Sequence, residues 1–406
     1  MFETYTLRYL GSENTDELLQ TLSIAMQGEN ETEKKLEFCF SNSVDSDFFY
    51  QILTKYKMNI VTLEIPVKRR LNDLLVDPDF KFDNLENLSL EFISGECMFR
   101  LVVENLLNIH SDQLKFIKID GLTVVDEESL VFKDFMALNY LSLNHVNDGL
   151  AFNLLSHCKT TLRSLHLNNI TFYNDYNPTV ASELYKLPNL SHLYLENVVM
   201  NSEESDVFGF IEHNANHLVA LSLDLVEDSN MSDFQWPTFS RLKYLMLVNT
   251  SELNPIMSKC DETLECLVIR CEDFLARDNM DGDNMDGIRM PRLKDFYTRC
   301  VNSVFLKNML SLNSNSLEFI CVDGDIFANE CQNIKFKNLK TILNLLSPED
   351  CSNVERAWIS SWCPDAQICN DERGDLWKNY IEEFTARCRN IRCSSLFRDK
   401  ALLCLP

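Results

Sequence analysis

The sequence predicts a curved α/β solenoid, with a parallel β-sheet on its concave side and helices on its convex side. Three observations lead to this prediction. Apolar residues at positions 1, 4 and 6 of a short pattern recur along the chain. Successive copies of the pattern begin 22 to 29 residues apart. The segments between copies carry apolar residues at helical spacing, and such regular self-similarity is typical of stacked repeats.

The predicted strands follow this pattern from one end of the chain to the other. The clearest copies are LNYLSL from Leu138, LRSLHL from Leu162, LSHLYL from Leu190, LVALSL from Leu218, LKYLML from Leu242 and LECLVI from Leu264. Variants begin at Ile60, Leu85, Leu114, Leu293, Leu317 and Leu339, and weaker copies near Thr4, Glu33, Cys363 and Cys388. Side chains alternate along a strand, so positions 4 and 6 point together into a core.

The predicted helices lie between these strands, as around Phe49–Tyr56, Phe99–Leu106 and Leu150–Leu155. Each unit is then a strand followed by a helix that returns antiparallel to it. One unit cannot bury its apolar side alone, but stacked units share a continuous core. We therefore predict a single domain over residues 1–406 with about 16 repeats. The strongest repeats span 60–345, and degenerate repeats span 1–59 and 346–406.

The pattern resembles leucine-rich repeat proteins over essentially the whole chain. In LLSHCKTTLRSLHL, IMSKCDETLECLVI and WISSWCPDAQIC a helix-like segment ends in Cys shortly before the next strand. This second feature resembles the repeats of F-box leucine-rich repeat proteins, which are substrate receptors of cullin-RING ubiquitin ligases. The resemblance implies a substrate-recognition or adaptor role in ubiquitination. The sequence departs from that family in having no F-box helix ahead of the strand near Thr4.

The amino-acid composition favours some classes of binding partner and some cellular compartments over others. The net charge of −25 disfavours nucleic acid and anionic membranes and favours basic protein partners. No signal peptide and no apolar stretch of the ~20 residues needed for a membrane span is found. None of the 15 cysteines forms a CxxC pair. We expect a monomer in the cytoplasm, with the nucleus as the alternative compartment.

The sequence contains few features that suggest catalysis. Phosphate-binding glycine loops, nucleophile elbows and HExxH pairs are all missing. His166 could meet Ser142 or Ser164 across neighbouring strands, but nothing supplies an oxyanion hole. We therefore expect no enzyme activity, no cofactor and no metal site.

The outward positions 3, 5 and 7 of each strand form the candidate binding surface on the concave side. They carry aromatic, Met and Arg side chains, which are enriched at protein-binding hot spots. The candidate partner-binding residues are Tyr140, His166, His192, Tyr194, Tyr244, Met246, Arg270, Tyr297, Arg299 and Phe319. An open sheet would leave these side chains uncovered, so we predict an exposed surface for a protein partner.

Two alternative functions remain open. The first is a stand-alone inhibitor or scaffold, similar to the ribonuclease-inhibitor branch of the repeat family. The acidic charge suits this alternative, but the irregular spacing of 22 to 29 residues does not. The second is a leucine-rich repeat GTPase-activating protein acting on the Ran GTPase. The acidic tail of that group has no counterpart in the final residues, RDKALLCLP.

The segment DNMDGDNMDG at residues 278–287 is a tandem duplication that resembles a calcium loop only in composition. An EF-hand loop needs oxygen ligands at positions 1, 3 and 5 and Gly at 6, and a Met or a misplaced Asp breaks every register. Removing one copy restores a spacing of 24 residues between Leu264 and Leu293. We interpret the segment as a duplicated surface connection.

Deletion of residues 278–282 should change the free energy of unfolding by no more than about 0.5 kcal/mol, as expected for a neutral surface change. Calcium should give no saturable signal at micromolar concentration. Thermal melting with and without Ca²⁺ or Mg²⁺ checks both points. A melting temperature raised by Ca²⁺ but not by Mg²⁺ would show that the segment binds calcium.

Overall fold

The computed structural model describes residues 4–9, 34–40, 46–67, 80–92, 99–122, 130–172, 185–200, 207–225, 234–248, 253–270, 288–299, 303–322, 334–344 and 367–370, with a few single positions between 20 and 26 and at 183. Contacts group the chain into two compact units. Unit 1 contains Met1–Asn189 and Met200–Ser205, and unit 2 contains Leu190–Val199 and Asp206–Pro406. The prediction of a single domain over residues 1–406 stays a prediction.

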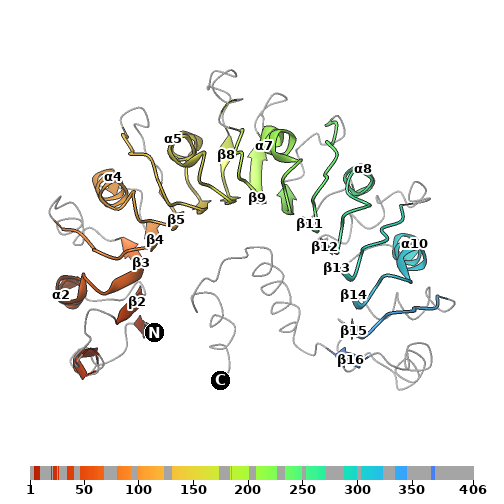
Figure 1. The fold of residues 1–406 in the computed structure, drawn as a ribbon, viewed down its shortest axis with the longest axis horizontal. Helices are drawn as coiled ribbons and strands as arrows, with labels where there is room; N and C mark the ends of the chain where they lie inside the picture. Colours follow the sequence, from red (N-terminus) through yellow and green to blue (C-terminus); the bar gives the residue numbers. More distant parts are fainter. Residues whose placement is uncertain are drawn as a thin grey trace. The chain divides into compact units, whose positions relative to one another are not determined.

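Unit 1 is a parallel sheet with helices on its outer side (Figure 1). Its strands pair in chain order, each with the next. They are β1 (Thr4–Tyr9), β2 (Lys35–Phe40), β3 (Ile60–Val67), β4 (Asn87–Phe92), β5 (Phe116–Asp120), β6 (Tyr140–Asn144) and β7 (Ser164–Asn168). The helices are α2 (Ser46–Tyr56), α4 (Phe99–Ile109) and α5 (Asp148–Cys158), and the short β8 covers Thr171–Phe172.

Unit 2 repeats this arrangement, again with parallel strands paired in chain order. The strands are β9 (His192–Met200), β10 (Ala220–Leu225), β11 (Tyr244–Val248), β12 (Cys266–Arg270), β13 (Asp295–Arg299), β14 (Phe319–Val322), β15 (Thr341–Asn344) and β16 (Gln367–Asn370). The helices α7 (Val207–Asn214), α8 (Leu253–Met257) and α10 (Ser303–Asn313) lie on the outer side of its sheet (Figure 1).

The core of each unit is a ladder of apolar side chains in register between the sheet and its helices. In unit 1, Ile117, Leu141 and Leu165 lie side by side and are all fully buried. The same row in unit 2 includes Leu245 and Leu267. Burying each such side chain stabilises the fold by about 1.5–3 kcal/mol. The predicted fold class, an α/β leucine-rich repeat solenoid with helices on the outer side, is confirmed within each unit.

Each predicted strand from Thr4 to Cys363 is a strand in the structure. The predicted register is wrong by two residues at Glu33 and Cys363, where Phe38 and Ile368 take the places predicted for Leu36 and Ala366. The predicted register at Cys388 lies outside the described residues. The three predicted helical segments are α2, α4 and α5. The described residues directly ahead of β4, β6, β11, β13 and β15, which are 80–86, 130–139, 234–243, 288–294 and 334–340, are non-helical.

In the repeats of α4, α5, α7, α8 and α10, a side chain at or just after the end of the helix bonds back to a carbonyl of that helix. The side chains of Asn214 and Asn313 donate to carbonyls four residues earlier, at 2.7 and 2.9 Å. Cys158 and Cys260 fill the same place with buried thiols. Burial raises the pKa of each thiol to about 12. These two cysteines are therefore inert packing residues, as a small buried Cys at a helix end is expected to be.

His110 directly follows α4 and takes the same place as these Asn and Cys residues. Its side chain forms hydrogen bonds to its own helix and to the chain of the preceding repeat. Its Nε2 accepts a hydrogen bond from the Phe82 backbone N–H at 3.0 Å, so Nδ1 carries the proton and donates to the Leu106 carbonyl at 2.8 Å. Asn313 makes the equivalent pair of bonds, accepting from the Met290 N–H at 2.7 Å. In this way the chain directly ahead of β4 is held to the end of α4, and the chain directly ahead of β13 is held to the end of α10.

Left-handed residues recur at the same repeat position. Gly121, with φ of 78°, and His145 and Asn169, with φ near 50°, directly follow β5, β6 and β7. Asn197, with φ near 50°, lies within β9, where the pairing with β10 shifts by one residue. The Gly121 and His145 N–H groups donate to the carbonyls of Asn144 and Asn168 in the neighbouring repeat, at 2.9 and 3.1 Å. A Cβ at position 121 would lie 2.4 Å from the Phe92 carbonyl oxygen. Only glycine fits there without displacing backbone.

Replacing Leu165 with Asp should unfold several repeats of unit 1. The side chain is fully buried, so the change removes about 1.5–3 kcal/mol of apolar burial and inserts an unpaired charge. Thermal melting followed by circular dichroism measures the effect. The control, Thr160→Asp at an exposed position, should leave the melting temperature nearly unchanged. Equal melting of Leu165→Asp and the control would show that the register is wrong.

Acid should weaken unit 1 through His110. Burial lowers the pKa of this imidazole below its usual 6.5, with smaller effects from the Leu106 carbonyl, Lys81 and Asp83. The unfolded chain therefore binds the proton first. The stabilisation is complete above pH 6.5 and decreases, by up to about 1.4 kcal/mol per pH unit, as the pH falls towards the folded-state pKa.

The matched variant for this prediction is His110→Asn, because Asn313 shows that an amide can make the same pair of bonds. Urea unfolding of both proteins between pH 7.5 and 5 measures the pH dependence. The variant should lose the part of the dependence that His110 contributes. Parallel pH profiles for the two proteins would contradict the prediction.

Candidate functional site

The candidate site is the inner face of the sheet, by which we mean the strand face turned away from the helices and the leucine core. In unit 2 the strand pairing aligns position 5 of successive repeats in one row. This row contains Tyr194, Ser222, Met246, Val268, Tyr297, Cys321 and Leu343. A parallel row at position 3 contains His192, Ala220, Tyr244, Cys266, Asp295 and Phe319.

These two rows in unit 2 form one apolar cluster. Its buried members are Tyr194, Ala220, Cys266, Val268, Tyr297 and Cys321, and the partly buried Tyr244, Met246 and Phe319 pack against them. Tyr297 and Phe319 stack with ring centroids 4.9 Å apart. We call this set the inner-face cluster. It brings together five of the predicted partner-binding residues.

The inner-face cluster is less exposed than the sequence predicts. An open sheet would leave its aromatic rings uncovered, whereas Tyr194 is 3% exposed and Tyr297 is 5% exposed. His192 is also buried, at 9%. Tyr244, Met246 and Phe319 are half-buried and retain some accessible surface. The prediction of an uncovered aromatic surface is therefore wrong for Tyr194 and Tyr297.

Two predicted residues, Arg270 and Arg299, lie opposite each other in the register of β12 and β13. The structure describes their backbone and not their side chains, so their predicted contribution to binding stays a prediction.

In unit 1 the inner face is more polar. Its position 5 row runs through Glu64, Ser89, Lys118, Ser142 and His166. The predicted residue Tyr140 is only 2% exposed and stacks on Phe116 with ring centroids 4.4 Å apart. Its exposure is therefore also overestimated by the sequence. His166 is half-buried on the neighbouring strand.

Ser142 and His166 do meet, as their spacing predicts. Ser142 Oγ lies 3.3 Å from His166 Nδ1. Asp120 on β5 contacts His145 instead, at 3.5 Å. The position 7 neighbours on β6 and β7 are Asn144 and Asn168, which are amides and not carboxylates. These contacts resemble a hydrogen-bonded pair on a sheet surface more than a serine nucleophile with its base.

A feature that the sequence analysis missed lies at the edge where the strands of unit 2 begin. Lys243 Nζ is 2.8 Å and Lys294 Nζ is 3.6 Å from the Glu265 carboxylate, and Lys340 pairs with Glu318 in the next repeats. The hydrogen bond from Lys243 lowers the pKa of Glu265, and the same bond raises the pKa of Lys243. Exposed pairs of this kind contribute at most about 1 kcal/mol each.

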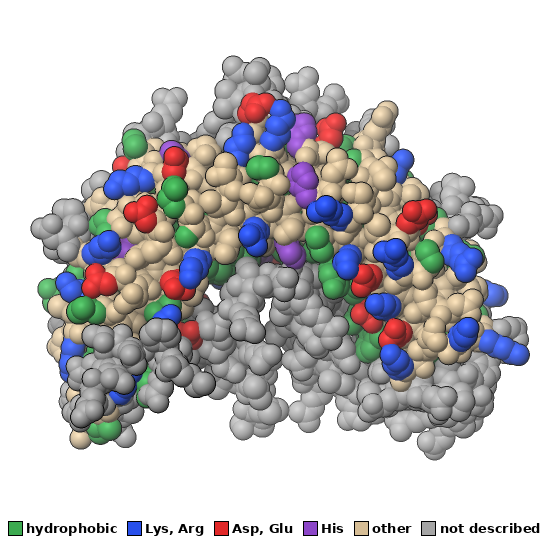
Figure 2. All heavy atoms as spheres, in the orientation of Figure 1, with side chains coloured by type: hydrophobic (Ala, Val, Ile, Leu, Met, Phe, Trp, Pro, Cys, Tyr) green, Lys and Arg blue, Asp and Glu red, His purple; other side chains and the backbone are tan. Residues whose placement is uncertain are grey.

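The sequence signal for this edge is the residue directly after the first leucine of each repeat. In unit 2 that residue alternates in charge from Lys243 through Glu265, Lys294 and Glu318 to Lys340. Parallel register then places opposite charges side by side. Figure 2 shows basic and acidic side chains interspersed over this side of the molecule. The net charge of −25 is therefore not visible as a uniformly acidic surface on the described residues in this view.

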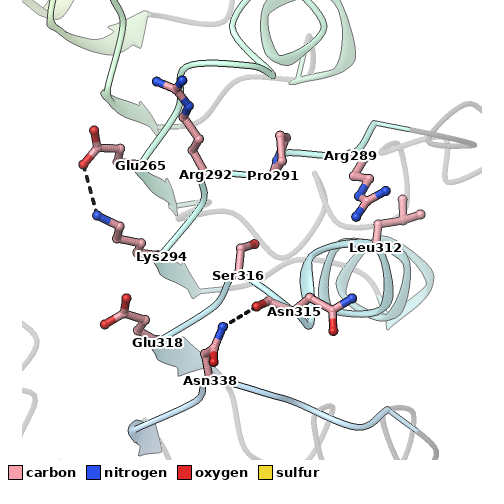
Figure 3. A pocket seen from close by; sticks show the side chains of 10 residues that line it. All are labelled: Glu265, Arg289, Pro291, Arg292, Lys294, Leu312, Asn315, Ser316, Glu318 and Asn338. Atoms are coloured by element: carbon pink, nitrogen blue, oxygen red, sulfur yellow. Dashed lines mark hydrogen bonds and ion pairs between the residues drawn. The ribbon is translucent and has the colours of Figure 1, made fainter.

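An open pocket of about 370 Å³ lies at the same edge of unit 2. Arg292 and Lys294 lie near Glu265 on one side, and Asn338 donates to the Asn315 carbonyl at 2.6 Å on the other (Figure 3). Small-molecule sites are usually enclosed and mostly apolar, with a few polar groups that converge on the ligand. This pocket has charges of both signs and wide access to solvent, so it does not resemble such a site.

No group of three or more potential metal ligands occurs among the described residues. Residues 278–287, predicted to be a surface connection, lie outside the described residues. Within the described part of the chain, no helix combines the length and apolar character needed to cross a bilayer.

Known proteins show little similarity to this chain in sequence or in structure. No protein-family model matches the chain, and no curated protein matches it. Among solved structures, the chain is similar to one in the crystal structure of the Rad7 and Elc1 complex in yeast. The identity is 14% and the TM-score is 0.39, over 88% of this chain and 89% of that chain. A similarity this remote carries no argument about function.

Proposed function

We propose that this protein is a leucine-rich repeat interaction module that binds a protein partner on the inner face of unit 2. The observation that carries the proposal is the inner-face cluster. It aligns aromatic, Met and Cys side chains in register over β9 to β14. Tyr and other aromatic side chains supply most of the binding energy at many protein interfaces.

The shape of the cluster favours a polypeptide as the ligand. Neighbouring strands lie about 4.8 Å apart, so the row from β9 to β14 extends over about 24 Å. A strip of this length is long for a small molecule but matches a helix or an extended segment laid across the strands. The half-buried rings of Tyr244 and Phe319 offer the partner accessible apolar surface.

A narrower proposal is that the partner is a substrate, and that the protein acts as a substrate receptor or adaptor in ubiquitin ligation. It is supported by the resemblance of the cysteine-ended helices, at Cys158 and Cys260, to those of F-box leucine-rich repeat proteins. We further propose that the protein acts by binding and not by catalysis, in the cytoplasm or nucleus, as a monomer.

Replacing Tyr244 and Phe319 together with Ala should greatly weaken partner binding. Loss of one aromatic anchor commonly costs about 2 kcal/mol, so two should lower affinity roughly a thousandfold. Affinity purification with crosslinking identifies the partner from the unmodified protein. Titration of that partner onto both proteins then measures the loss.

The matched control is Val304→Ala with Lys307→Ala on the outer side of α10, where both side chains are exposed. It should leave affinity unchanged, and melting curves should confirm that all proteins are folded. Repeating the titration at two salt concentrations separates the inner face from the charged edge around Glu265. Full binding by the double variant, lost only at high salt, would mean that the partner binds the edge.

A further inference from the structure

The edge of unit 2 where β11 to β15 begin is basic, although the whole chain is acidic. This charged edge consists of the described residues that lead into these strands, which are 234–243, 258–265, 288–294, 314–318 and 334–340. Nine of its side chains are basic, namely Arg241, Lys243, Lys259, Arg289, Arg292, Lys294, Lys335, Lys337 and Lys340. Four are acidic, namely Asp261, Glu262, Glu265 and Glu318. Over the whole chain the balance is reversed, with 37 basic and 62 acidic residues.

Three arginines of the charged edge form no ion pair with any described residue. The carboxylates of Glu265 and Glu318 are already bound by lysines that lead into the neighbouring strands. Arg241, Arg289 and Arg292 are all exposed, and within the described part of the chain none of their side chains forms an ion pair or a hydrogen bond. Their positive charge is therefore available to a ligand.

Two of these arginines occupy a repeat position that is structural elsewhere in the chain. The residue directly ahead of the first apolar residue of a repeat is often an asparagine whose side chain donates to a carbonyl of the preceding repeat. Such bonds, 2.6–2.9 Å long, are made by Asn59, Asn84, Asn189 and Asn338. Arg241 and Arg292 stand at the same position, directly ahead of Leu242 and Leu293. In these two repeats an exposed positive charge thus takes the place of a contact between repeats.

The open pocket of about 370 Å³ lies at the charged edge and is lined by Arg289, Arg292 and Lys294. Asn315 and Asn338 lie across from Arg292 and Lys294 (Figure 3). A guanidinium holds a carboxylate through two parallel N–H donors, and side-chain amides can donate further hydrogen bonds. Because the pocket is open to solvent, it suits an acidic side chain carried on a polypeptide better than a small molecule that must be enclosed.

We propose that the charged edge binds an acidic segment of a protein partner, with the segment running across β11 to β15. The register of β11, β12 and β13 places Arg241 and Arg292 at equivalent positions two strands apart. At ~4.8 Å per strand, this separation is about 9.6 Å. An extended polypeptide rises ~3.3 Å per residue, so carboxylates three residues apart in the partner match the spacing of the two arginines.

This inference goes beyond the proposed function, because the charged edge and the inner-face cluster are different surfaces of unit 2. The net charge of −25 predicts basic partners for the chain as a whole. Salt at physiological concentration screens exposed charges over ~8 Å, so a short acidic segment responds mainly to the cations beside it. A nucleic acid carries its charge beyond the edge and meets the acidic remainder of the chain. An acidic polypeptide segment is therefore the favoured ligand.

Binding of fluorescein-labelled decaglutamate to the full chain tests the proposal. The unmodified protein should raise the anisotropy of the peptide saturably at low ionic strength, and added salt should weaken the binding. Replacing Arg241 and Arg292 together with Glu should weaken it at least about tenfold, because attraction at both positions becomes repulsion.

The matched control is Lys133→Glu with Lys307→Glu, which changes the net charge equally at exposed positions outside the charged edge. This control should bind decaglutamate nearly as well as the unmodified protein does. Melting curves show whether each variant is folded. If Arg241→Glu with Arg292→Glu lowers the melting temperature, Arg241→Gln with Arg292→Gln removes both charges more mildly and should still weaken binding.

Four results would overturn the proposal. Absence of saturable binding by the unmodified protein would show that the charged edge holds no acidic segment. Equal weakening in the edge variant and the control would show that only net charge matters. Tighter binding of decathymidylate than of decaglutamate would assign the edge to nucleic acid. Tighter binding of decaglutamate after deletion of residues 278–282 would show that aspartates of the chain itself compete for the edge.

Discussion

The structure depends on the register between successive parallel strands. A single strand with its two or three inward leucines cannot exclude water from them. Alignment of Ile117, Leu141 and Leu165 across three repeats turns separate apolar side chains into a continuous dry layer. The same alignment determines everything on the other side of the sheet. Because side chains alternate, a row of core leucines also creates rows of outward residues, including the inner-face cluster.

Register was also the part of the fold that could be predicted from the sequence. The apolar pattern has a period of two within a strand, and a shift by one residue would send every leucine to solvent. The pattern therefore identifies strands even where spacing varies, as between Leu242, Leu264 and Leu293. The hydrogen bonds that hold one repeat to the next were harder to foresee. They are made by single residues such as His110 and Asn313, whose partners Phe82 and Met290 lie more than twenty residues away.

The candidate site was predictable only in part. Pairing aligned Tyr194, Met246 and Tyr297 as expected, and Ser142 meets His166 as its spacing suggests. Their burial was not predictable, since a strand pattern defines which way a side chain points and contains no information about what lies above it. The charged edge around Glu265 was visible in the sequence. These ion pairs were not predicted, because a charged residue after a leucine forms such a pair only if the residue beside it in the next repeat has the opposite charge.

The left-handed turns at Gly121, His145, Asn169 and Asn197 have a consequence for how this chain can change over time. The backbone N–H groups of Gly121 and His145 donate hydrogen bonds to the next repeat. The last pairing bond of each strand is thus made before its connecting segment begins. Insertions and deletions beyond such a turn need not shift any strand. The repeat spacing is 22 residues from Leu242 to Leu264 and 29 from Leu264 to Leu293, yet the strands in these repeats pair residue for residue. A longer spacing, such as the one that contains the DNMDG duplication, therefore leaves the strands on both sides paired in register, which makes the connecting segments a natural place for new sequence to accumulate.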